Sequence, residues 1–405
     1  MFEYFPHHYG WNFATLLAMG LGANLSEVDD ACGELMEISV GNNQAATEEF
    51  FYGWKTVGDR LFALALQDRN AGRGLSASGK FRRAAIYYLI AERTQSPGFA
   101  PRRELYLRMQ EAFRCFLDSG AHDCEAVAIP FLGEVLPALV VKARGAQPAP
   151  CVLHFVGLDA MKEQIFLSGL PQELARRGVS TVIVDLPGAG ESLRLRNLHT
   201  TLDQESVATA CIDYLHTRAD VDVERIGAAA IGLAGYTALR AMAADTRLGC
   251  CAVLGATYDW KETFQQYLTG GDDQQPLPFF FEHVKWAFGL RSIDECMQMA
   301  SKMHLRDVLH CIDRPVLMLH GMNEHTQRLE LARRTYDGCA LSPARTLRVL
   351  STGEGGAEYC GIDNFPIAFD AISDWLVDTL HTSRPASEIG GIGLRPERSS
   401  SYIRR

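Results

Sequence analysis

The sequence predicts an α/β protein: a mainly parallel sheet with helices on both faces, preceded by a helical domain. From about residue 123, short apolar runs alternate with helical patterns, as in parallel sheets that are covered on both faces. Residues 1 to about 120 instead repeat apolar positions every three or four residues, which is the helical period. Over fifty residues separate the apolar runs that end at Thr257 and begin at Arg314, and this stretch is too long for a plain loop.

The helical domain is expected over residues 1–120. The helical period is clearest in "ATEEFFYGWKTVGDRLFALALQD" (46–68) and "RRELYLRMQEAFRCFLDSG" (102–120), and no convincing strand interrupts the region. Ser26 with Asp29 predicts a capping pair at the start of one helix.

The core is expected in two parts, residues 121–258 and 313–382, with a lid insertion over 259–312 and a tail over 383–405. It begins with "EAVAIPFLGEVLPALVVKA", which predicts two strands joined by a turn at Gly133. The later strands are expected at "CVLHFVG" (151–157), "VSTVIVDLP" (179–187), "RIGAAAI" (225–231), "GCCAVLGAT" (249–257), "RPVLMLHG" (314–321) and "ARTLRVLS" (344–351).

Composition narrows the class of function. The net charge of −10 gives no electrostatic support for binding nucleic acid. No stretch approaches the roughly 18 apolar residues that span a bilayer, and "MFEYFPHHYGWNF" lacks the pattern of a signal peptide. The eleven cysteines form no CxxC pair and no metal spacing. We therefore expect a cytoplasmic protein with reduced thiols and no metal. The sequence has no complete dinucleotide-binding motif, so no cofactor is expected. The expected partner is a small-molecule substrate, and a homodimer is also expected.

The stretch "RIGAAAIGLAGYTALRAMA" (225–243) predicts a strand, a tight turn and a helix. Many hydrolases place a nucleophilic serine at the point of such a turn, within the motif G-x-S-x-G. Here Ala230, Gly232 and Ala234 stand where the motif has Gly, Ser and Gly.

Further stretches carry a resemblance to a known family. The chain resembles the α/β-hydrolase group that includes 2,6-dihydroxypseudooxynicotine hydrolase, the fermentation-respiration switch protein and fungal hydrolases that shorten polyketide chains. The resemblance implies an α/β-hydrolase core with a helical N-terminal cap. The matching stretches are "GLDAMKEQ" (157–164), "DLPGAGESLRLR" (185–196), "DVDVERIG" (220–227), "GLAGYTALRA" (232–241), "PVLMLHGMNE" (315–324) and "EGGAEYCGIDN" (354–364).

The resemblance also implies where a catalytic triad would lie. It places the nucleophile at Gly232, the acid at Glu324 and the histidine at Tyr359, so that only the acid survives. Without a hydroxyl or thiol at 232 there is no acyl-enzyme route, and without an imidazole at 359 there is no ordinary general base. Ordinary serine hydrolysis is therefore not expected.

The remaining groups could still catalyse proton transfer. The resemblance places an oxyanion hole at the backbone amides near Gly157–Leu158 and of Leu233. Glu324 is expected to act as a base, and Tyr359 as a proton donor or anchor, because an unperturbed phenol with a pKa near 10 is a poor base.

Other residues are secondary candidates. Among the histidines that could replace the lost base, His325 is preferred to His154 and to His320, for which a packed histidine is expected. Asp159 is expected to order the oxyanion loop. It is assigned to the substrate-binding surface with Tyr236 and Tyr258.

The predicted function is a non-hydrolytic enzyme that isomerises, cyclises, eliminates or changes a C–C bond in a small carbonyl-bearing metabolite of secondary metabolism. Two alternatives stay open. The absence of both a serine at position 232 and a histidine at position 359 favours a catalytically dead protein that only binds a small molecule. Cys360 beside Tyr359 would allow an ester or C–C hydrolase with a non-serine nucleophile. In the simplest interpretation, Gly232 is a plain strand–helix turn, Tyr359 fills the space of a histidine and Glu324 is a solvated carboxylate.

Overall fold

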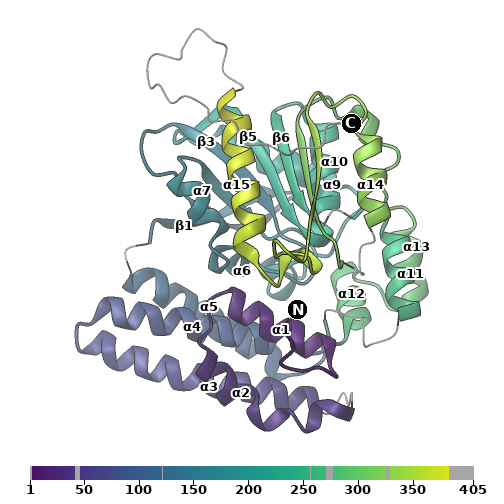
Figure 1. The fold of residues 1–405 in the computed structure, drawn as a ribbon. Helices are drawn as coiled ribbons and strands as arrows, with labels where there is room; N and C mark the ends of the chain where they lie inside the picture. Colours follow the sequence, from purple (N-terminus) through teal and green to yellow (C-terminus); the bar gives the residue numbers. More distant parts are fainter. Residues whose placement is uncertain are drawn as a thin grey trace.

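An eight-stranded sheet lies at the centre of the protein (Figure 1). The computed structural model describes residues 2–41, 46–120, 122–255, 257–270, 277–324 and 329–382. The strand order is β1-β2-β4-β3-β5-β6-β7-β8; β1 and β2 are antiparallel to their neighbours, and the strands from β4 to β8 are parallel. The predicted α/β class is confirmed. The strands are β1 (Cys124–Phe131), β2 (Glu134–Val141), β3 (Ala149–Phe155), β4 (Ser180–Val184), β5 (Val221–Ile231), β6 (Leu248–Leu254), β7 (Val316–Gly321) and β8 (Arg345–Leu350).

Helices cover both faces of this sheet, and the alternation of side chains along the strands explains why. In β5, Ala229 packs into one hydrophobic core, whereas Ala228 and Ala230 pack into the other. Helices α6 (Lys162–Leu167), α7 (Leu170–Arg176) and α15 (Phe365–Thr382) cover the first face. Helices α9 (Gln204–His216) and α10 (Gly235–Ala244) cover the second. The core also contains α8 (Gly190–Arg194) and α14 (Leu329–Gly338).

The N-terminal residues form a layer of helices that lies below the sheet in Figure 1. One difference from the sequence analysis concerns a cap: Asn24, not Ser26, caps α2, because its side chain accepts a hydrogen bond of 3.1 Å from the backbone N–H of Ser26. The helices are α1 (Tyr9–Gly20), α2 (Leu25–Cys32), α3 (Ala46–Asn70), α4 (Gly74–Arg93) and α5 (Pro101–Ser119), with short 3₁₀ turns at Gly33–Leu35 and Ile38–Gly41.

The segment between β6 and β7 contains three further helices, α11 (Trp260–Gly270), α12 (Phe280–Phe288) and α13 (Ile293–Ala300). Helix α13 begins with a capping box made by Ser292 and Glu295. The aromatic rings of Trp260, Phe264 and Phe288 pack on one another, with centroids 5.4–6.0 Å apart.

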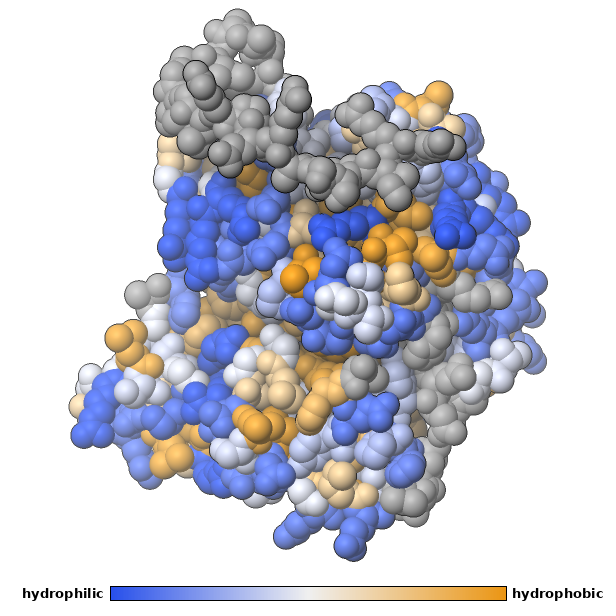
Figure 2. Space-filling view, viewed as in Figure 1, coloured by the Kyte–Doolittle hydropathy of each residue, from blue (hydrophilic) through white to orange (hydrophobic). Residues whose placement is uncertain are grey.

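The seam between the helical layer and the core is apolar, and Figure 2 shows hydrophobic residues along it. The buried residues of α4 and α1 belong to the same hydrophobic core as those of α15. Within the described part of the chain, no helix is both long and apolar enough to cross a membrane.

Candidate active site

The turn after β5 has the geometry of a sharp strand-to-helix elbow. β5 ends at Ile231, a 3₁₀ turn follows over Gly232–Ala234, and α10 begins at Gly235. Gly232 has φ of 65°, a backbone conformation that glycine adopts at little steric cost. A Cβ atom at this position would lie 3.2 Å from Oη of Tyr359 and 3.4 Å from Sγ of Cys360.

Tyr359 therefore occupies the space directly above the elbow. It lies in the 3₁₀ turn Tyr359–Gly361, and its ring packs against Phe13 of α1 with centroids 5.9 Å apart. Burial, together with nearby Cys360, raises the pKa of Tyr359 well above its usual value, so the phenol stays protonated. Sequence reasoning missed Asp363, whose carboxylate accepts hydrogen bonds from the backbone N–H groups of residues 356–358 and thereby fixes this loop.

Glu324 lies behind this loop. Its side chain is fully buried, and its carboxylate lies 3.7 Å from Nδ1 of His320. Burial raises the pKa of Glu324 well above its usual value, which the backbone amides of Gly321 and Cys360 offset only in part. Burial thus favours the protonated form of Glu324, and this residue does not belong to the described lining of the neighbouring pocket. A solvated carboxylate, the simplest interpretation of the sequence, is wrong for this residue.

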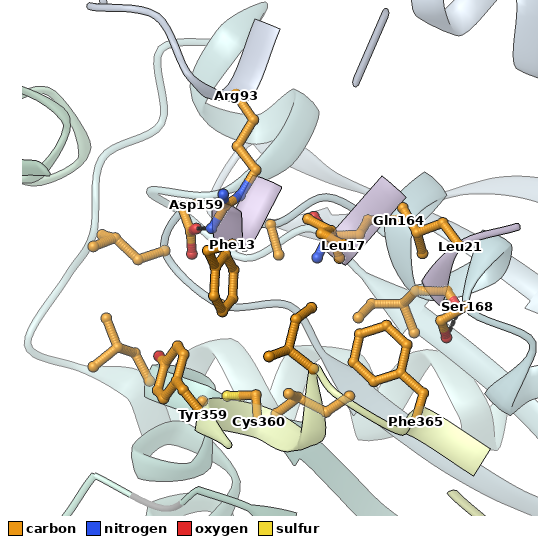
Figure 3. A pocket seen from close by; sticks show the side chains of 18 of the residues that line it. Phe13, Leu17, Leu21, Arg93, Asp159, Gln164, Ser168, Tyr359, Cys360 and Phe365 are labelled. Atoms are coloured by element: carbon orange, nitrogen blue, oxygen red, sulfur yellow. Dashed lines mark hydrogen bonds and ion pairs between the residues drawn. The ribbon is translucent and has the colours of Figure 1, made fainter. Parts of the chain in front are cut away.

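The pocket itself lies between the elbow, the loop after β3 and the N-terminal helices (Figure 3). It encloses about 710 Å³ when the open space at its mouth is included. Most of its wall is apolar. The residues that line it include Phe13, Leu17, Leu21, Phe155, Ile165, Ile231, Gly232, Leu233, Ile362, Phe365 and Phe369, with the polar or ionisable side chains of Arg93, His154, Asp159, Gln164, Ser168, Tyr359 and Cys360.

The loop after β3 approaches the elbow closely. A Cβ atom on Gly157 would lie 3.5 Å from the backbone nitrogen of Ala234. The structure therefore brings the backbone of Gly157–Leu158 and of Leu233 to one wall of the pocket, where the resemblance implied an oxyanion hole.

Asp159 contributes a charged group to the same wall. It forms an ion pair with Arg93 of α4, whose guanidinium also lies over the ring of Phe13 at 5.3 Å. Burial alone would raise the pKa of Asp159, but the charge of Arg93 and its hydrogen bond outweigh burial and keep the pKa below its usual value. The pocket wall thus holds an ionised carboxylate.

His283 of α12 supports this loop from behind, and sequence reasoning missed it. Its Nε2 lies 3.0 Å from the carbonyl oxygen of Leu158. Burial and nearby Arg102 and Arg194 lower the pKa of His283 to about 3, so the ring is neutral. Because a carbonyl only accepts, Nε2 must carry the hydrogen.

A buried ionic cluster joins the N-terminal helices, the core and the insertion. Glu92 of α4 accepts hydrogen bonds of 2.7 Å from Nε of Arg102 in α5 and from Nε of Arg194 in α8. Burial by itself would raise the pKa of Glu92, but the two guanidinium groups outweigh it and hold the pKa at about 2. Both guanidinium groups also lie over the ring of Trp286, at 5.0 and 5.7 Å.

Lys162 and Asp185 order the start of α6. The backbone N–H of Lys162 donates a hydrogen bond of 2.7 Å to Asp185, and its Nζ lies 3.2 Å from the same carboxylate and 2.9 Å from Glu191. These contacts lie outside the pocket lining given above.

The structure separates the remaining predicted residues from the described pocket. Tyr236 is buried against Trp260, with ring centroids 6.1 Å apart, and burial raises its pKa to about 12. Tyr258 is half-buried beneath the guanidinium of Arg334. His325 lies outside the described residues.

Comparisons with known proteins agree with this architecture. No protein-family model matches the sequence. The hydrolase ORFZ of Pyricularia oryzae is 28% identical over 284 residues, which make up 64% of this chain and 64% of that protein, so the match spans a little less than two thirds of this relative. The hydrolyase poxO of Penicillium oxalicum is 27% identical over 416 residues, covering 94% of this chain and 92% of that protein.

Solved structures show the same fold. The crystal structure of 2,6-dihydroxy-pseudo-oxynicotine hydrolase has a TM-score of 0.74 at 23% identity, covering 92% of this chain and 97% of that one. Wild-type AbyA5 has a TM-score of 0.63 at 17% identity, covering 91% and 97%. The chain therefore has the α/β-hydrolase fold.

Proposed function

We propose that this protein is an enzyme that transfers protons on a small carbonyl-bearing molecule and forms no acyl-enzyme. One observation carries the proposal: the hydroxyl of Tyr359 lies 3.2 Å from where a side chain at Gly232 would begin. A protonated phenol thus stands where the resemblance expects a nucleophile. A phenol that keeps its proton can donate a hydrogen bond to a substrate oxygen, whereas it cannot attack a carbonyl carbon.

The roles follow from charge and access. Tyr359 and the amides of Leu158 and Leu233 would bind the carbonyl oxygen and stabilise the enolate. Asp159 would take the proton from the adjacent carbon, because it is the ionised carboxylate on the pocket wall. Glu324, the base expected from sequence, is enclosed and lies outside the described pocket lining, so we assign it to support of the loop that carries Tyr359.

A carboxylate whose pKa is held low is a weak base, so the substrate needs an acidic C–H bond next to its carbonyl. Elimination of water from a β-hydroxy ketone fits this requirement. The C–H bond beside the carbonyl breaks, the C–O bond of the hydroxyl breaks, and a conjugated C=C bond and water form. The name hydrolyase carried by poxO of Penicillium oxalicum is compatible with such chemistry.

The test uses 4-hydroxy-4-phenylbutan-2-one, whose dehydration yields a conjugated ketone that absorbs in the ultraviolet. We expect dehydration above the buffer rate, and a loss of about 10²–10⁴-fold in Tyr359→Phe. Tyr258→Phe is the matched control, because this tyrosine lies outside the described pocket lining. Equal turnover in Tyr359→Phe and the parent protein would refute the assignment of the phenol.

A second candidate is a protein that binds a small molecule without turnover. It is favoured by the pairing of Gly232 with Tyr359, which fills the nucleophile's space. Binding of an apolar dye with no dehydration of any β-hydroxy ketone would support it. A cysteine hydrolase is disfavoured, because burial and Glu324 raise the pKa of Cys360 well above its usual value and leave it a thiol. A cytoplasmic location and a homodimer stay predictions.

A further inference from the structure

The pocket has a second polar region, on the side away from Tyr359. Figure 3 shows Gln164, Ser168 and Phe365 on one side of the pocket, and Asp159 and Tyr359 on the other. The mechanism proposed above uses only the side that carries Asp159 and Tyr359. His154 lines the pocket as well, and it comes from β3.

His154 is a buried imidazole without a side-chain partner. It is 1% exposed, and neither Nδ1 nor Nε2 forms a hydrogen bond with a side chain in the described ranges. Burial lowers the pKa of His154 to about 4, so at pH 7 the ring is neutral. A neutral imidazole offers one N–H donor and one nitrogen acceptor.

Gln164 adds a second unsatisfied group to the same pocket. Its Oε1 is buried and has no hydrogen-bond partner among the residues that the structure describes. Buried polar groups in proteins are nearly always hydrogen-bonded, because leaving one unpaired lowers the stability of the folded state. An unpaired amide oxygen and an imidazole without a side-chain partner in one apolar cavity indicate a place where a ligand can supply hydrogen bonds.

We propose that His154 and Gln164 form a subsite that binds an un-ionised hydroxyl group on an otherwise apolar, ring-containing ligand. A hydroxyl donates one hydrogen bond, which Gln164 Oε1 can accept, and it accepts one, which the imidazole N–H can donate. The ring would pack among apolar side chains such as Phe365 and Phe369. This subsite deepens the proposed function, since it specifies the substrate of the same pocket.

Charged groups do not fit this side of the pocket. A carboxylate would face Gln164 Oε1, which is also an acceptor, and the guanidinium of Arg93 is already paired with Asp159 at the other side. A buried charge without a partner is strongly unfavourable. The subsite therefore selects a neutral donor–acceptor group.

The experiment compares three probes with the same ring system: 2-naphthol, naphthalene and 2-naphthoate, each displacing an apolar fluorescent dye from the full-length protein. We expect 2-naphthol to bind at least about tenfold more tightly than naphthalene, which corresponds to one net hydrogen bond. It should also bind more tightly than 2-naphthoate. Equal affinity for 2-naphthol and naphthalene, a preference for 2-naphthoate, or no displacement by any probe would overturn the proposal.

Variants locate the preference in these residues. His154→Leu and Gln164→Met should reduce the ratio of the 2-naphthol and naphthalene affinities to about one. The melting temperature of His154→Leu shows whether this variant is folded, so that a lost preference is not mistaken for unfolding. Gln172→Met is the matched control: Gln172 of α7 also has a buried Oε1 without a described partner, but it is outside the described pocket lining. A naphthol preference that survives in both pocket variants would overturn the proposal.

The subsite and the proposed reaction can fail separately. Tyr359→Phe should lower dehydration by about 10²–10⁴-fold and keep the preference for 2-naphthol, because the phenol lies on the other side of the pocket from Gln164. If the parent protein prefers 2-naphthol but does not catalyse dehydration, the proposed reaction is wrong and the subsite stands. If it shows no preference for 2-naphthol, the subsite is wrong.

Discussion

Replacing Gly232 by serine would restore the residue type expected at the elbow, and the structure predicts that it costs stability without creating a hydrolase. The left-handed φ of 65° costs a residue with a Cβ about 1–2 kcal/mol. The new Cβ would also lie 3.2 Å from Oη of Tyr359, and crowding of this kind in a packed site costs about 1–3 kcal/mol. The expected total loss is about 2–5 kcal/mol in the free energy of unfolding.

Urea denaturation measures this loss of free energy. The variant Gly72→Ser separates the contribution of backbone strain from that of crowding. Gly72 has φ of 73° and nothing within 4 Å of its Cβ position, so serine there meets only backbone strain. The double variant Gly232→Ser/Tyr359→Phe removes the hydroxyl that meets the new side chain and should recover part of the loss.

No ester hydrolysis is expected from Gly232→Ser, because position 359 carries a phenol instead of an imidazole, and because the enclosed Glu324 has a raised pKa. The assays are turnover of a nitrophenyl ester and labelling by a fluorophosphonate, read by intact mass. Equal destabilisation of the Gly72 and Gly232 variants, or a serine at 232 that reacts with the fluorophosphonate, would refute this account of the elbow.

Three further predictions test buried groups. Because the pKa of Glu324 is raised, the unfolded chain loses this proton above about pH 4.5 while the folded protein still holds it. The free energy of unfolding should therefore fall as pH rises above this value. Glu324→Gln should reduce this slope by up to about 1.4 kcal/mol per pH unit. Glu92→Gln leaves two guanidinium groups buried without a counter-charge and should lower the free energy of unfolding by about 3–5 kcal/mol, as measured by urea denaturation. Glu111→Gln, in an exposed pair, should lower it by only about 0–1 kcal/mol. Similar losses in the two variants would contradict the role of the cluster. Iodoacetamide at pH 7.5 should modify exposed Cys311 and leave Cys360 unmodified in the native protein, as mapped by peptide mass; rapid labelling of Cys360 would show an accessible thiolate.

The alternation of strands and helices was enough to predict the core of the fold, because hydrophobic periodicity is local. The apolar runs "CVLHFVG" and "RPVLMLHG" are the buried strands β3 and β7. The helix predicted near Lys162 begins at that residue. The cap of α2 was missed, because Asn24 and Ser26 are both good capping residues and only the backbone turn distinguishes them.

The site was less accessible to sequence reasoning. Gly232 and Tyr359 were both singled out, but their contact joins positions far apart in the chain. His283 could not be predicted as a functional residue, because nothing in its helical stretch marks it. Its role depends on its contact with the carbonyl of Leu158, which only the structure shows. Gln164 lies within a recognised motif, yet nothing in the motif indicates an unpaired amide oxygen.

By itself, therefore, the sequence determined the order of the elements, the position of the elbow and the presence of a glycine there. Those properties depend on residue types and on their spacing along the chain. Only the tertiary structure decided that Glu324 is enclosed, that Asp159 is an ionised carboxylate on the pocket wall and that His154 lacks a side-chain partner. Protonation and hydrogen bonding depend on burial and on neighbours contributed by distant segments, and chain folding alone brings those together.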